Sequence, residues 1–111
     1  MRRCEQIVTE ARIQEVAERL RRAAPDATII LFGSRARGDA RDSSDLDILV
    51  VEPKITSRHA EMVRLSREVR DLDVTVDILV TSAATFAKWA GESCTVYHEA
   101  ARDGRVLYAA G

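Results

Sequence analysis

Residues 45–51 read Asp-Leu-Asp-Ile-Leu-Val-Val, and residues 74–80 read Val-Thr-Val-Asp-Ile-Leu-Val. Both segments are short, apolar and rich in β-branched residues, which predicts two buried strands. Between them, apolar residues recur at helical spacing through 57–71, and Ser57 stands where an N-cap is expected. The sequence therefore predicts a crossover helix between two strands of a sheet.

Acidic side chains interrupt both predicted strands. Successive strand residues point to opposite faces, so Asp45 and Asp47 share a face, with Cα atoms roughly 6.6 Å apart. If the strands are neighbours with Asp47 opposite Asp77, the leucines two positions later also fall on that face. Three carboxylates would then meet at one site, where they repel one another unless cations intervene.

Three converging carboxylates are suited to hard divalent cations. We expect two Mg²⁺ ions, with Mn²⁺ as the alternative, about 3.5 to 4 Å apart. Such ions complete their coordination with water and phosphate oxygens, so a triphosphate is the expected ligand. The pair Gly33-Ser34 follows an apolar run and offers backbone N–H groups and a hydroxyl to phosphates. Because glycine has no side chain, Gly33 would let a phosphate approach the backbone closely.

The whole chain alternates helical and strand patterns, without a repeat or low-complexity tract. The expected fold class is α/β (α+β), a small mixed β-sheet flanked by helices that lie mainly on one side, in a single domain over 1–111. The other predicted elements are an amphipathic helix over 5–24, a strand over 28–32, a helical turn over 34–38, a loop over 38–44, a helix capped by Thr81 or Ser82, a helix over 93–102 that ends at Gly104, and a strand over 106–108.

Composition excludes several classes of protein. The 111 residues carry 17 basic and 18 acidic side chains, so no global positive field attracts nucleic acid or an anionic membrane. We expect neither as a direct partner. Two distant cysteines, Cys4 and Cys94, indicate neither a disulfide framework nor a zinc site. Without an apolar leader or a membrane span, the expected location is cytoplasmic.

These residues together carry a family resemblance. Gly33-Ser34, ten further residues, Asp45-x-Asp47 and then Asp77 are similar to the signature of the DNA polymerase beta-like nucleotidyltransferase superfamily. Over almost its whole length the chain resembles the smallest members, the minimal nucleotidyltransferases (MNT). The resemblance implies a nucleotidyltransferase fold in which Gly33 and Ser34 contact nucleotide phosphates. It also implies that Asp45 and Asp47 ligate both metals, while Asp77 completes the metal site on the nucleophile side.

The resemblance also implies an activity and a partner. An acceptor hydroxyl would attack the α-phosphorus of ATP, and Mg-pyrophosphate would leave. Many MNT proteins belong to toxin–antitoxin pairs, so this chain resembles the antitoxin of a HEPN/MNT pair that places AMP on a tyrosine of the HEPN ribonuclease toxin. Arg35 and Arg37 are candidate phosphate or partner contacts; solvation, or pairing with Asp39 and Asp42, is the equally weighted alternative.

The acceptor site is the open question. A chain of 111 residues has little room for an acceptor domain, so we expect the acceptor surface to come largely from another protein. Phe86, Trp89 and Tyr97 are candidate contacts, although packing on the sheet is favoured for the first two. Two alternatives remain: an antitoxin that neutralises by binding alone, and nucleotidyl transfer to a small molecule. Nucleotide preference and oligomeric state, homo- or hetero-oligomeric, stay open.

Overall fold

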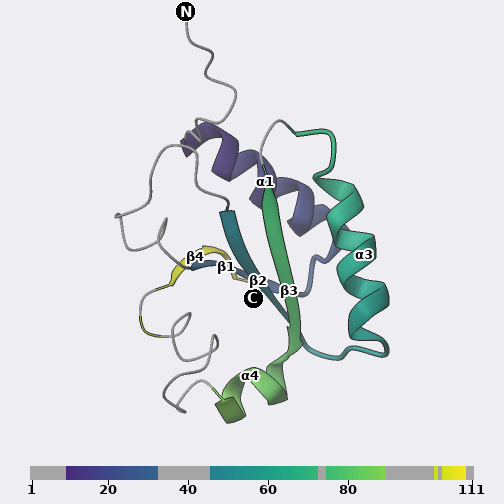
Figure 1. Ribbon diagram of the computed structural model, residues 1–111. Coiled ribbons are helices and arrows are strands. Elements are labelled where there is room, and N and C mark those ends of the chain that lie inside the picture. The colour runs from purple at the N-terminus through teal and green to yellow at the C-terminus, as the bar shows by residue number, and fades with distance from the viewer. Residues whose placement is uncertain (1–9, 33–45, 73–74, 90–101, 103, 110–111) are drawn as a thin grey trace, which may run out of the picture.

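The computed structural model describes residues 10–32, 46–72, 75–89, 102 and 104–109. These segments form three helices and four strands, and the helices flank a central sheet (Figure 1). The elements are α1 (Glu10–Ala23), β1 (Thr28–Phe32), β2 (Leu46–Glu52), α3 (Arg58–Glu68), β3 (Val76–Ser82), α4 (Ala83–Trp89) and β4 (Arg105–Tyr108).

The sheet has four strands in the order β3-β2-β1-β4. β2 and β3 are parallel, whereas β1 is antiparallel to both β2 and β4. The sheet is therefore mixed, as predicted. A parallel neighbour requires a crossover, and α3 provides it between β2 and β3.

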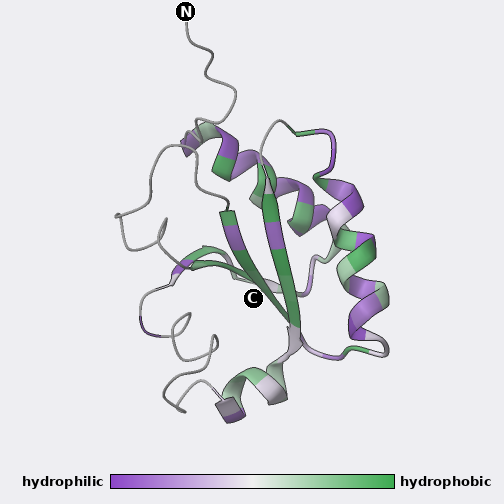
Figure 2. Ribbon diagram, in the orientation of Figure 1, coloured by the Kyte–Doolittle hydropathy of each residue, from purple (hydrophilic) through white to green (hydrophobic). Residues whose placement is uncertain are grey.

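Two apolar clusters cover the two faces of the sheet. The larger joins α1 and α3 to alternate residues of the strands, among them the fully buried Leu20, Leu65 and Ile48. The smaller lies on the other face and consists of Ile30, Phe32, Leu49 and Val51, with Leu79 and Phe86 packed against it. Figure 2 shows mainly hydrophobic strands and helices whose hydrophilic residues alternate with hydrophobic ones. The prediction that helices lie mainly on one side is confirmed.

The crossover helix begins where predicted but ends earlier. Ser57 is the N-cap of α3, and its Oγ accepts a hydrogen bond from the Ala60 N–H at 3.2 Å. The predicted end at 71 is wrong, because Val69 leaves helical geometry with φ −116° and ψ 5°. Its N–H donates to the Ser66 carbonyl at 3.3 Å, which closes a tighter turn. Val69 and Leu72 are nevertheless buried. The apolar spacing that predicts a helix therefore continues beyond the last residue of α3.

The strand boundaries also differ in detail from those predicted. The strand over 28–32 is confirmed, whereas β3 continues to Ser82 instead of ending at 80. Thr81 is a buried strand residue, not a cap. Ser82 takes that role, since its Oγ accepts from the Thr85 N–H at 3.2 Å. β2 runs one residue past the predicted end, and β4 begins one residue early. The predicted start of the first helix, the segments 34–38 and 38–44, and nearly all of 93–102 lie outside the described residues.

A long-range ion pair joins the edge strand to the first helix. Arg105 of β4 donates to both carboxylate oxygens of Glu10 at the start of α1. Hydrogen bonds from Arg105, and next from Gln14, lower the pKa of Glu10 to about 2. Because this pair is exposed, it orients β4 on α1 more than it stabilises the fold.

The Ser57 cap can be tested by replacing the serine. Ser57→Ala leaves the Ala60 N–H without its side-chain acceptor, so the free energy of unfolding should fall by about 1 kcal/mol in urea titrations. Ser66→Ala is the matched control, because Ser66 is exposed within the same helix and alanine favours helices. Equal losses in both variants would show that the cap contributes nothing specific.

Candidate functional site

The repeated segments of the sequence pair residue for residue. In the parallel register of β2 and β3, Asp47 lies opposite Asp77, and Ile48, Leu49 and Val50 lie opposite Ile78, Leu79 and Val80. The register expected from strand faces is therefore confirmed. Figure 2 shows the outcome as a hydrophilic band near the start of each of these two neighbouring strands.

Both carboxylates lie on the sheet face opposite α1 and α3. Leu46 and Ile48 belong to the cluster that packs under those helices, and Asp47, between them, points the other way. Asp47 is half-buried, whereas Asp77 is exposed on the edge strand. Neighbouring strands lie about 4.8 Å apart, so the two carboxylates are close enough to repel each other. Bound cations would relieve that repulsion.

Phe32 flanks Asp47 on its other side. The last residue of β1 pairs directly with Asp47 in the antiparallel register, and its side chain is buried. Together with Leu49 and Leu79, Phe32 forms an apolar surface next to the two acids. Sequence reasoning did not single out Phe32, although its place directly before Gly33 was a usable signal.

The remaining predicted site residues lie outside the described residues. These are Gly33, Ser34, Arg35, Arg37 and Asp45. Within the described segments, no group of three or more His, Cys, Asp or Glu side chains is arranged to hold a metal ion. Asp47 and Asp77 are thus the part of the predicted three-carboxylate set whose positions are described.

The aromatic residues predicted as candidate contacts for the acceptor lie in different environments. Phe86 of α4 packs against the smaller apolar cluster, which agrees with the packing interpretation. Trp89, at the end of α4, is 39% exposed, and the Lys88 Nζ lies 5.2 Å from the centroid of its ring. Tyr97 lies outside the described residues.

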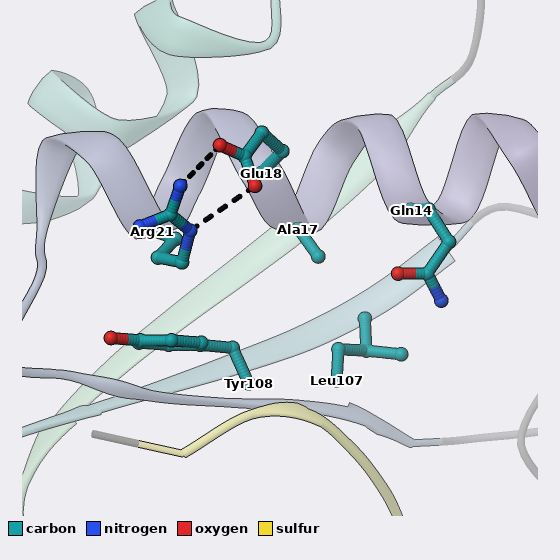
Figure 3. A pocket seen from close by; sticks show the side chains of 6 residues that line it. All are labelled: Gln14, Ala17, Glu18, Arg21, Leu107 and Tyr108. Carbon is teal, nitrogen blue, oxygen red and sulfur yellow. Dashed lines mark hydrogen bonds and ion pairs between the residues drawn. The ribbon is translucent and has the colours of Figure 1, made fainter. Parts of the chain in front are cut away.

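A groove of about 300 Å³ lies between α1 and β4, away from the two acids (Figure 3). Figure 3 shows the Arg21 guanidinium bonded to Glu18 and the Tyr108 ring facing α1. The guanidinium carbon lies 5.6 Å from the ring centroid, within reach of a cation–π contact. Hydrogen bonding to Glu18 is the main cause that raises the pKa of Arg21. These contacts pack the edge strand against the helix, and neither Asp47 nor Asp77 lines the groove.

Comparison with known proteins gives a match to one protein family and to several solved structures. The nucleotidyltransferase domain family matches residues 13–92. A protein from Sulfolobus solfataricus described as a nucleotidyltransferase is similar in structure, with a TM-score of 0.62, 27% identity, and coverage of 87% of this chain and 77% of that one. Comparison with curated protein sequences gave no significant match.

Two further similar structures are toxin–antitoxin complexes. One contains AMP-PNP, with a TM-score of 0.60, 23% identity, and coverage of 86% of this chain and 73% of that one. The other is the tri-AMPylated HEPN toxin of Shewanella oneidensis with an MNT antitoxin, with a TM-score of 0.54, 21% identity, and coverage of 86% and 67%. At these identities the likeness establishes the fold. Among the described helices, none has both the length and the apolar character to cross a membrane.

The repulsion between the two acids gives a testable stability effect. Without divalent cations, Asp77→Asn removes one of two like charges on neighbouring strands, so the free energy of unfolding should rise by roughly 0.2–1 kcal/mol. The measurement is urea unfolding in the presence of a chelator.

Asp71→Asn is the control, and its expected change in the free energy of unfolding has the opposite sign. Arg19 donates to both oxygens of Asp71, at 2.7 and 3.1 Å, so this variant should lose stability. A loss of stability in Asp77→Asn as well would contradict the electrostatic account of the paired acids.

Proposed function

The chain belongs to the nucleotidyltransferase domain family, and we propose that it transfers AMP from ATP to a tyrosine hydroxyl of a partner protein, releasing pyrophosphate. The proposed partner is a HEPN-domain ribonuclease toxin, for which this chain acts as the antitoxin. The observation that carries the proposal is the pairing of Asp47 with Asp77 on one sheet face, beside the end of β1.

Chain connectivity supports the placement of the phosphate-binding residues. Gly33 and Ser34 follow Phe32 directly, and consecutive Cα atoms are 3.8 Å apart, so Ser34 lies within about 7.6 Å of the Phe32 Cα. Phe32 is itself the cross-strand partner of Asp47. We propose that the backbone N–H groups of Gly33 and Ser34 and the Ser34 hydroxyl bind phosphates held at Asp47. Arg35 and Arg37 come one and three residues after Ser34, and we propose them as further phosphate contacts.

The donor set fits hard divalent cations. Asp45, Asp47 and Asp77 offer carboxylate oxygens, which Mg²⁺ and Mn²⁺ prefer, and Asp47 and Asp77 already face each other across neighbouring strands. We propose that these three residues hold two such ions together with the triphosphate. When bound, the cations would neutralise phosphate charge and favour ionisation of the attacking hydroxyl.

The protein side chains contribute position and a proton acceptor. In the proposed reaction the tyrosine oxygen forms a bond to the α-phosphorus of ATP as the bond from that phosphorus to the pyrophosphate oxygen breaks. The hydroxyl proton must leave, and the exposed Asp77 carboxylate is the proposed group that helps to take it. The half-buried Asp47 lies between Phe32 and Asp77 on the sheet, which limits its freedom to move.

The partner is proposed from structural likeness. Two similar structures are toxin–antitoxin complexes, one containing AMP-PNP and the other an AMPylated HEPN toxin. A hetero-oligomer with such a toxin in the cytoplasm is the proposed assembly, since it would bring the acceptor hydroxyl to the acids from outside this chain.

Mass spectrometry of the partner tests this proposal. The chain is mixed with a candidate HEPN toxin, ATP and Mg²⁺, and the intact mass of the toxin is recorded. A mass increase of one or more AMP groups is expected. The rate at which the toxin gains AMP should fall at least a hundredfold in Asp47→Asn or Asp77→Asn. A loss on the order of this size is expected when a key catalytic group is removed.

Asp71→Asn is the matched control, because Asp71 is exposed and bonded to Arg19 outside the site. It should retain the transfer rate. If the toxin is inhibited without any gain in mass, the chain neutralises it by binding alone and not by AMP transfer. Transfer that survives Asp77→Asn unchanged would remove Asp77 from the mechanism.

A further inference from the structure

A second group of acids lies on the opposite face of the sheet. Glu52 is the last residue of β2, and its side chain points to the helix-covered face, as do those of Ile48 and Val50. Its Oε2 atom is buried and has no hydrogen-bond partner among the residues that the structure describes. A buried carboxylate oxygen without a donor is costly while the group is charged.

The neighbour of Glu52 is another carboxyl. The Glu61 side chain, in the first turn of α3, lines the same surface hollow as Glu52 and is only 18% exposed. Arg64 donates from Nε and Nη2 to Glu61 and from Nη1 to the Ala23 carbonyl at 2.8 Å. The guanidinium therefore neutralises Glu61, and these hydrogen bonds go to Glu61 and Ala23 and not to Glu52.

The other groups around Glu52 do not replace that missing donor. Lys54, on the loop after β2, lines the same surface hollow of about 470 Å³ as Glu52, Glu61 and Arg64. The cross-strand neighbour on β3 is Ser82, which does not titrate, and its Oγ is bonded to Thr85. From α1, the Ala23 carbonyl reaches Arg64.

We propose that Glu52 and Glu61 share one proton in the folded protein and so form a pH-sensitive link between the end of β2 and the start of α3. Two carboxylates accept but cannot donate, so they bond to each other only when one is protonated. Glu61, paired with Arg64, is the charged member, and Glu52 carries the proton.

The direction of titration agrees with this assignment. Burial, and next the contact with Glu61, raises the pKa of Glu52 to about 7 from an ordinary value of 4.5. Hydrogen bonding from Arg64 lowers the pKa of Glu61. Because the folded protein holds the Glu52 proton more tightly than the unfolded chain does, the stabilisation is complete below pH 4.5 and is lost as pH rises through about 7.

The link has a structural consequence. It holds the first turn of the crossover helix against β2, and that helix leads to β3, which is in register with β2. Deprotonation therefore places two like charges between helix and strand at the start of the crossover. The proposal concerns the fold and does not depend on nucleotidyl transfer.

Unfolding at two pH values tests the link. Between pH 5.5 and 8.5, the folding equilibrium constant of the wild-type chain should fall about tenfold, which allows for partial exposure of Glu52. Glu52→Gln should abolish this dependence, because its amide donates to Glu61 at both pH values. Glu68→Gln, an exposed carboxyl on the same helix, should behave as wild type.

Carbon-13 NMR of the carboxyl groups provides a second, independent measurement. One glutamate should titrate near pH 7, and its signal should be absent from Glu52→Gln. Glu61→Gln should also flatten the pH dependence, which preserves the test if the first variant does not fold. Wild-type stability that does not change over this pH range, or the same dependence in Glu52→Gln, would overturn the proposal.

Discussion

The parallel pairing of β2 with β3 is the constraint on which the rest of the structure depends. Parallel neighbours cannot be joined by a tight turn, so the chain needs a helix that covers one sheet face, and α3 does this through the fully buried Leu65. The same pairing leaves Asp47 and Asp77 together on the other face. The larger apolar core on one face and the paired acids on the other are therefore two results of one register.

That register places an unfavourable pair of charges where it is tolerable. Each acid is the second residue of its strand, near the end of the apolar surface, and Asp77 is exposed on an edge strand. A one-residue slip of β3 would turn Asp77 toward the helices and Ile78 away from them. The buried Ile78 and Val80 thus stabilise the same arrangement that brings like charges together.

Local sequence patterns predicted which helices and strands form better than they predicted where those elements end. Ser57 caps α3 as expected, since a serine before a helical pattern satisfies a free N–H locally. The end of α3 was misplaced, because Val69 and Leu72 keep their burial in a turn. Thr81 and Ser82 were the alternative caps, and Ser82 takes the role because Thr81 is a buried residue of β3. Helix and strand ends depend on packing that periodicity does not record.

The sequence by itself determined which segments form strands, the alternation that puts Asp47 and Asp77 on the same kind of face, and the family signature from Gly33 to Asp77. Tertiary structure alone decided which strands are neighbours and that Phe32 flanks Asp47. It also decided that Glu52 and Glu61 line the same surface hollow, a proximity that no spacing rule predicts. The physical reason is that side-chain direction follows from local geometry, whereas proximity follows from how the whole chain buries its apolar surface.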